Sequence, residues 1–231
     1  MRKWIAMVMG LALVIGGVAL VAGTRMATAQ GGGTIEAEVK YSGPAQIEKL
    51  KVNKDTEKCG TEAVVEHVVV GGNKGLANAV VSVPGAKGST AAKAVLDQHG
   101  CKFVPHVLVM QPGELEVKNS DDILHNLHTY STANPSINKA QPKFKKTMTE
   151  KLEKPEMVKV TCDVHSWMLG WVAVVPGLAG VTDSNGVAKI ENVPAGKQKV
   201  EVWHETLGKM EKEVDVKAGA VTKVSFEMKG K

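Results

Sequence analysis

Short, valine-rich runs of alternating apolar and polar residues recur along the sequence after Gly33, separated by turns rich in Gly, Pro and Asn. Alternation with a period of two is typical of strands buried on one face. One short segment, residues 89–100, reads equally well as a helix or a loop. The spacing of strands and turns predicts an all-β protein made of sandwiches or Greek-key barrels. The predicted strands are residues 34–41, 67–71, 77–83, 106–110, 114–119, 126–130, 157–162, 171–175, 187–193, 199–205, 211–217 and 222–228.

The first 29 residues have the pattern of an export signal. Arg2 and Lys3 precede an uncharged apolar run, and Ala27-Thr28-Ala29 forms a small-x-small cleavage motif before Gln30. We therefore expect residues 1–29 to be removed and the mature chain to be periplasmic or otherwise extracytoplasmic. Because the apolar run is about 21 residues long, close to the ~20 that span a bilayer, a retained N-terminal anchor is the alternative.

Charge and cysteine content narrow the possible functions. Of the formal net charge of +5, three charges belong to Arg2, Lys3 and Arg25 of the expected signal. Elsewhere lysines are interleaved with glutamates and aromatic residues make up only 4% of the chain, so nucleic acid is not an expected partner. The sequence contains no G-x-S-x-G motif, so no such nucleophile setting indicates a hydrolase. Exported proteins usually pair their cysteines, yet this chain has three, so one thiol needs another role.

The segment "CDVHSWM" places Cys162, His165 and Met168 within seven residues. One thiolate, two imidazoles and a weak axial thioether form the ligand set of blue-copper electron-transfer sites. Predicted strands flank this segment, so it is expected to be a loop that wraps one ion. The best candidate for the fourth ligand is His125, in a polar turn after strand 114–119, because His128 points to the opposite face of its strand.

The arrangement "PGELEVKNSDDILHNLH", followed by "CDVHSWMLGWVAVV", resembles the cupredoxins over residues 103–175. It is most similar to the amicyanin type, with its C-x2-H-x2-M loop and H-N-x-H sequence. The resemblance implies a Greek-key β-sandwich that binds one type 1 copper ion. Ser166 stands where amicyanin-type loops carry proline, and Asp163 where a small residue is common. The implied ligands are His125, Cys162, His165 and Met168.

The resemblance also implies roles for the neighbours of these ligands. Asn126 would hydrogen-bond across to the segment of Cys162, and Asp163 would lie in the same outer shell of the metal. His165 would be the ligand nearest the surface. Electrons would leave there, past Trp167 and Leu169.

With Cys162 assigned to the metal, the two other cysteines are free to pair. We predict a disulfide between Cys59 and Cys101. A second metal site formed by Cys101 and His106 is the alternative. Zinc competes with copper for thiolate and imidazole, but structural zinc sites usually contain two or more cysteines and no methionine.

The end of the chain resembles the carboxypeptidase-regulatory-like (transthyretin-like) β-sandwich in its "TDSNG" and "NVPAG" motifs. The first strands of that family match "GTIEAEVKYSG" and "GLANAVVSVPG", far upstream. We therefore expect a small outer sandwich formed by residues 30–89 and 178–231, with the cupredoxin domain inserted as residues 90–177. Two consecutive domains divided near Gly177 are the simpler alternative.

Together these features predict a protein that carries single electrons and is not an enzyme. Its expected partners are redox proteins, such as c-type cytochromes or a periplasmic dehydrogenase. A copper carrier or resistance protein, and a non-redox binding module, are the alternatives. A copper carrier would favour exposed Met- and His-rich tracts, whereas the ten methionines here are scattered.

Overall fold

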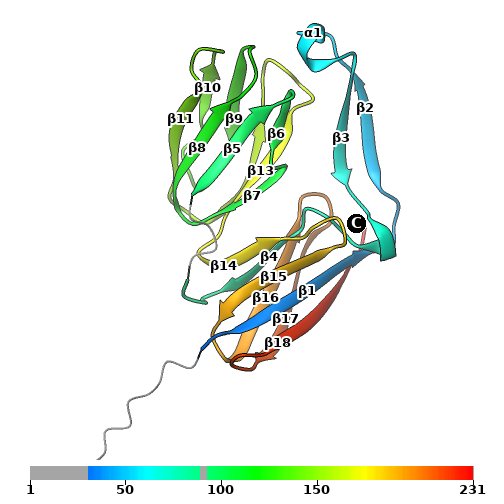
Figure 1. Ribbon diagram of the computed structural model, residues 1–231, viewed down its shortest axis with the longest axis vertical. Helices are drawn as coiled ribbons and strands as arrows, with labels where there is room; N and C mark the ends of the chain where they lie inside the picture. The colour runs from blue at the N-terminus through cyan, green and yellow to red at the C-terminus, as the bar shows by residue number, and fades with distance from the viewer. Residues whose placement is uncertain (1–30, 89–92, 231) are drawn as a thin grey trace, which may run out of the picture.

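The computed structural model describes residues 31–88 and 93–230. These residues form two β-sandwiches and a separate hairpin (Figure 1), with one turn of α-helix, α1 (Thr56–Cys59), and a short 3-10 turn, η1 (Gly72–Lys74). The predicted all-β class is therefore confirmed. The predicted export signal, residues 1–29, lies outside the described residues. Within the described ranges, no helix is long and apolar enough to cross a membrane.

The outer sandwich combines strands from both ends of the described chain. One sheet has the order β15-β1-β18 and the other β14-β4-β16-β17. Ile35, Ala37 and Val39 of β1 are fully buried, while the residues between them are half-buried, as expected for a strand with one face on a core. The strands are β1 (Gly33–Tyr41), β4 (Val80–Pro84), β14 (Gly177–Val181), β15 (Val187–Val193), β16 (Gly196–His204), β17 (Gly208–Val216) and β18 (Val221–Met228).

The inserted sandwich comprises β5 to β13, which lie between β4 and β14 in the chain. A five-stranded sheet, β10-β9-β12-β13-β7, faces a four-stranded sheet, β11-β8-β5-β6. Leu96, Leu115 and Leu127 are fully buried in the core between them. The strands are β5 (Ala94–His99), β6 (Lys102–Val104), β7 (Val107–Met110), β8 (Gly113–Asn119), β9 (His125–Tyr130), β10 (Asn138–Gln141), β11 (Thr147–Leu152), β12 (Glu156–Thr161) and β13 (Leu169–Val174).

The helix considered for residues 89–100 is not formed over residues 94–99, which are strand β5. This strand runs parallel to β8, with Leu96 opposite Val117, and buries alternate side chains. Pairing within a sheet therefore overrides the helical preference of an Ala- and Lys-rich composition. Residues 89–92 lie outside the described ranges.

The hairpin consists of β2 (Gln46–Lys51) and β3 (Glu62–Val68), joined by a tip that contains α1. Figure 1 shows it standing beside the inserted sandwich, with α1 at its far end. The sequence grouped this segment with the outer sandwich, but Val52, Ala63 and Val65 are buried in the core cluster of the inserted sandwich. We call residues 46–68 the covering hairpin.

The two sandwiches are in direct contact. A small apolar cluster joins Val80 of the outer sandwich to Val107 of the inserted one. Beside it, the Glu205 carboxylate accepts a 2.6 Å hydrogen bond from Trp171 Nε1 and pairs with His106 Nε2. This interface combines apolar packing with a partly buried polar network.

Candidate metal centre

The candidate ligands meet at one end of the five-stranded sheet. β12 runs antiparallel to β9, with Thr161 opposite His128, so the start of β9 lies beside the end of β12. His125 is the first residue of β9, and residues 162–168 form the loop that connects β12 to β13. Antiparallel pairing thus brings together residues that are 37 positions apart in the sequence.

His125, Cys162 and His165 form a buried cluster, with exposed fractions of 0%, 2% and 0%. The two Nδ1 atoms of the histidines are 3.0 Å apart, and Cys162 Sγ lies 3.8 Å from His165 Nδ1. One ligand atom from each residue lies within 4.8 Å of the other two. The three side chains therefore converge on one point.

Each imidazole has its other nitrogen bonded to a carboxylate. His125 Nε2 lies 2.8 Å from Asp121 Oδ2, and His165 Nε2 lies 2.9 Å from Asp55 Oδ2. Because a carboxylate only accepts, each Nε2 carries a proton, and a ring without a second proton keeps its lone pair on Nδ1. The two lone pairs then face each other at 3.0 Å, which is unfavourable unless a cation or proton lies between them.

The spacing and chemistry of this cluster fit a copper ion. Two imidazole nitrogens that each lie about 2.0–2.1 Å from one metal are separated by roughly 3 to 4 Å. The observed separation of 3.0 Å agrees with this range. One thiolate and two imidazoles form the trigonal plane of blue-copper sites, whereas structural zinc sites usually contain more cysteines.

The protonation states also suit metal binding. Burial lowers the pKa of His125 and keeps its imidazole neutral, although the Asp121 carboxylate opposes this effect. Burial raises the pKa of the Cys162 thiol, against the hydrogen bonds from the N–H groups of Asn126, Val164 and His165. A buried thiol of this kind becomes a thiolate when a cation takes the place of its proton.

The two other cysteines, Cys59 and Cys101, form a disulfide, which confirms the predicted pairing. The alternative of a second metal site at Cys101 and His106 is therefore wrong, because neither sulfur of the disulfide is a free thiol. Cys162 is the free cysteine.

Asn126 and Asp163 connect the two segments that carry the ligands. Asn126 N–H donates to Cys162 Sγ at 3.3 Å, and Asn126 Oδ1 accepts from the Asp163 N–H at 2.9 Å. The Asp163 carboxylate also lies 2.8 Å from His128 Nδ1, so His128 contacts this network rather than the cluster. These bonds hold the start of β9 against the ligand loop.

Met168 is buried in the same loop, and its N–H donates to the His165 carbonyl oxygen at 2.9 Å. Its role as axial ligand stays a prediction. Trp167 is only 6% exposed and donates from Nε1 to the Cys101 carbonyl oxygen at 3.2 Å. The expected electron exit at Trp167 is therefore not at the surface, while Leu169 is half-buried and its role stays a prediction.

His165 is fully buried, like the other candidate ligands, so the expectation that it is the ligand nearest the surface stays a prediction. The sequence missed both carboxylates that bind the ligand rings. Asp121 could have been identified from the sequence, since it lies four residues before His125 in the same polar turn. No sequence feature pointed to Asp55, since it lies 110 residues before His165 and reaches the site only through tertiary packing.

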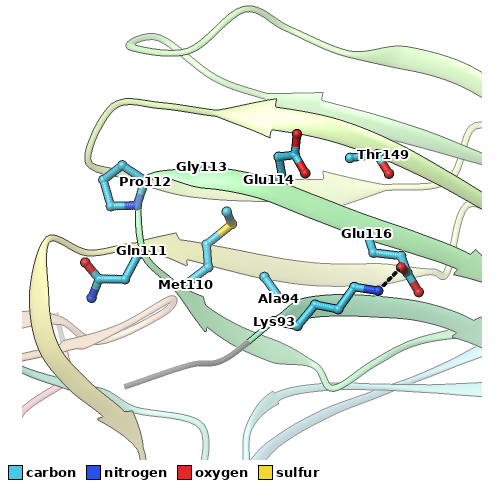
Figure 2. Close-up of a pocket in the computed structure, with 9 residues that line it drawn as sticks. All are labelled: Lys93, Ala94, Met110, Gln111, Pro112, Gly113, Glu114, Glu116 and Thr149. Carbon is cyan, nitrogen blue, oxygen red and sulfur yellow. Dashed lines mark ion pairs between the residues drawn. The ribbon is translucent and has the colours of Figure 1, made fainter. Parts of the chain in front are cut away.

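A hollow near the start of β8 is separate from this cluster (Figure 2). It is lined by Met110 and Glu114, among others, and its Lys93 and Glu116 form an ion pair. Since β8 runs from this hollow toward the turn that precedes His125, the two features lie beyond opposite ends of one strand. None of the candidate ligands lines the hollow.

The sequence matches no protein-family model and no curated protein. Among solved structures, the chain is similar to a copper-containing nitrite reductase from Thermus scotoductus, with 22% identity over 42% of this chain and a TM-score of 0.32. It spans only 25% of that reductase chain. A purple cupredoxin from Nitrosopumilus maritimus matches with 19% identity over 36% of this chain and 99% of its own, at a TM-score of 0.31.

Amicyanin from Paracoccus versutus matches with 16% identity over 41% of this chain and 96% of its own, at a TM-score of 0.32. Identities below 25% and TM-scores near 0.3 assign no function to this chain. The case for copper therefore rests on the geometry of His125, Cys162 and His165.

Proposed function

We propose that this protein is an exported type 1 copper protein that carries single electrons between redox partners. One observation carries the proposal: the Nδ1 atoms of two buried histidines face each other at 3.0 Å, beside a buried thiol. A bound copper ion supplies the electron-transfer chemistry by cycling between its monovalent and divalent states. The residues that would hold it are His125, Cys162 and His165, together with Met168 of the same loop.

The residues around the cluster favour electron transfer over catalysis. The cluster is enclosed by protein, and a hydrogen-bond network fixes the ligand segments. A rigid set of ligands moves little between oxidation states, which makes electron exchange fast. Substrate chemistry instead requires an open coordination position, and the three ligand side chains are at most 2% exposed.

The disulfide supports export to an oxidising compartment, where such bonds persist. We propose a periplasmic or other extracytoplasmic location. The partners would be redox proteins, such as c-type cytochromes or a periplasmic dehydrogenase, that meet this protein in small transient interfaces. A copper carrier fits less well, because a covered ligand such as His165 favours retention of the metal.

The decisive experiment is a copper titration of the purified protein, followed by its visible spectrum. We expect one copper per chain and an intense thiolate-to-copper absorption. Cys162→Ser should abolish the colour, while His204→Gln, which alters a histidine of β16 in the outer sandwich, should retain it. Stoichiometric copper without this absorption would refute the type 1 site. Electron transfer is then tested by mixing the reduced protein with an oxidised c-type cytochrome, where no exchange would refute the carrier function.

A further inference from the structure

We propose that the covering hairpin belongs to the metal centre, where it shields His165 from solvent. Asp55, at the tip of the hairpin, is a positioning residue for His165. This inference rests on the proposed copper function and extends it. It assigns the orientation and the covering of one ligand to a segment that is more than 100 residues distant in the sequence.

The backbone of Asp55 points to a specific role. This residue has φ 50° and ψ 37°, in the left-handed region that residues other than glycine seldom adopt. It precedes helix α1, where an aspartate side chain usually accepts a hydrogen bond from the first turn, yet it makes no such bond. Its Oδ2 instead accepts from His165 Nε2 at 2.9 Å. Aspartate is one of the few residues other than glycine that tolerate this conformation, but neither the backbone nor helix capping requires its carboxylate here. The contact with His165 gives that carboxylate a role.

The disulfide ties this carboxylate to the one on the other histidine. Cys59 N–H donates to the Asp55 carbonyl oxygen at 2.9 Å, and Cys59 is bonded to Cys101. Cys101 N–H in turn donates at 2.9 Å to Asp121 Oδ2, the atom that accepts from His125. One covalent link therefore joins the segments that orient the two imidazoles.

The apolar side of the hairpin lies over the ligand loop. Val64 and Val65 of β3 line a small hollow together with Trp167 and Met168. Val65 also belongs to the same buried core cluster as these two side chains. This packing holds the hairpin against the loop and leaves His165 with no exposed surface.

This arrangement has two consequences for the metal. The carboxylate fixes the proton of His165 on Nε2, so Nδ1 faces the ion and its basicity is raised. A second negative charge next to a ligand, in addition to that of Asp121, favours the divalent over the monovalent ion. We therefore expect Asp55 to lower the reduction potential and the hairpin to shield His165 from solvent and from partner proteins.

The covering is tested in the metal-free protein by labelling histidines with diethyl pyrocarbonate and measuring the rate at His165 by mass spectrometry. Asp55→Gly keeps the left-handed backbone accessible and removes the carboxylate. We expect it to accelerate labelling of His165 at least tenfold. Glu57→Gln removes a charge from the same turn at an exposed position and should leave the rate unchanged. Equal rates in wild type and Asp55→Gly would overturn the proposal.

The electrostatic role is tested by the reduction potential of the copper-loaded protein. Asp55→Asn keeps the size of the side chain and tolerates the same backbone conformation. We expect it to change the relative affinity for the two oxidation states about tenfold, which raises the potential by about 59 mV. A potential equal to that of Glu57→Gln would overturn this role. Because the labelling needs no metal, a failure of the hairpin proposal is distinguished from a failure of the copper function, which appears as absent colour in wild type.

Discussion

The Nδ1 atoms of His125 and His165 face each other at 3.0 Å, while their Nε2 atoms bond to Asp121 and Asp55. Unless a proton lies between them, this arrangement brings two lone pairs together, and a bound cation relieves the repulsion. We expect copper to raise the free energy of unfolding by about 4 kcal/mol at a free concentration 1,000-fold above Kd. Calorimetry with and without copper measures the corresponding rise in Tm.

Two histidine variants separate a specific effect from adventitious copper binding. His125→Ala removes one ligand and should abolish most of the rise in Tm. His204→Gln changes a buried histidine in β16 of the outer sandwich and should retain it. An equal rise in both variants would show that copper stabilises the protein at another place.

Asp121 is expected to contribute to copper affinity through His125. Burial alone would raise the pKa of Asp121, but the N–H groups of Cys101 and Gly100 and the His125 ring outweigh burial and lower it. The carboxylate is therefore charged and holds the His125 ring in place. Loss of such an outer partner typically costs 10–100-fold in metal affinity, and we expect this loss for Asp121→Ala in a competition titration with a chelator.

Asp122→Ala is the matched control for Asp121, because Asp122 is the next residue, is exposed and pairs with Lys146. It should leave copper affinity within about twofold of wild type, since no ligand contacts it in the described structure. If both variants lost affinity equally, the effect would come from the charge of the turn and not from the bond to His125.

The ligand loop was predictable because its chemistry is local. Cys162, His165 and Met168 lie within seven residues, and His125 directly follows a strand and a polar turn. The alternating pattern of β1 was equally clear, since one face of that strand is buried. Where local sequence alone determines the pattern, the structure and the sequence agree.

The remaining parts depend on packing between distant segments. β2, with the sequence "QIEKLK", exposes nearly all its side chains, so no alternation marked it as a strand. The covering hairpin was consequently assigned to the outer sandwich, and Asp55 was not considered near His165. No pattern in a single sequence shows that a polar hairpin covers a site 110 residues away.

The Cys59–Cys101 disulfide should stabilise both the fold and the covering hairpin. It joins residues 42 positions apart, which corresponds to about 4 kcal/mol of loop entropy removed from the unfolded chain. We expect the double variant Cys59→Ser/Cys101→Ser to lose about 3–4 kcal/mol in urea unfolding of the metal-free protein.

Hydrogen exchange measured by mass spectrometry locates the effect of the disulfide. The double variant should show faster amide exchange than wild type in residues 46–68. The strands of the outer sandwich should exchange at rates close to those of wild type. Uniformly faster exchange over all strands would contradict a specific role in holding the hairpin.

His204 should make the stability of the protein pH-dependent. It is 1% exposed, and burial lowers its pKa to about 4, with the charge of His106 acting in the same direction against that of Glu205. As the pH falls below about 6.5, the unfolded chain binds a proton at this residue before the folded protein does. The stability contributed by the neutral ring is therefore fully present above about pH 6.5 and is lost progressively down to pH 4.

The measurement is urea unfolding of the metal-free protein between about pH 4 and pH 7. As the pH falls, the free energy of unfolding of wild type should decrease by up to about 1.4 kcal/mol per pH unit through His204. His204→Gln should remove this part of the pH dependence. His67→Gln is the control, because that side chain is 35% exposed on β3. If His204→Gln and wild type had parallel pH profiles, the buried neutral ring would not be a source of the acid sensitivity.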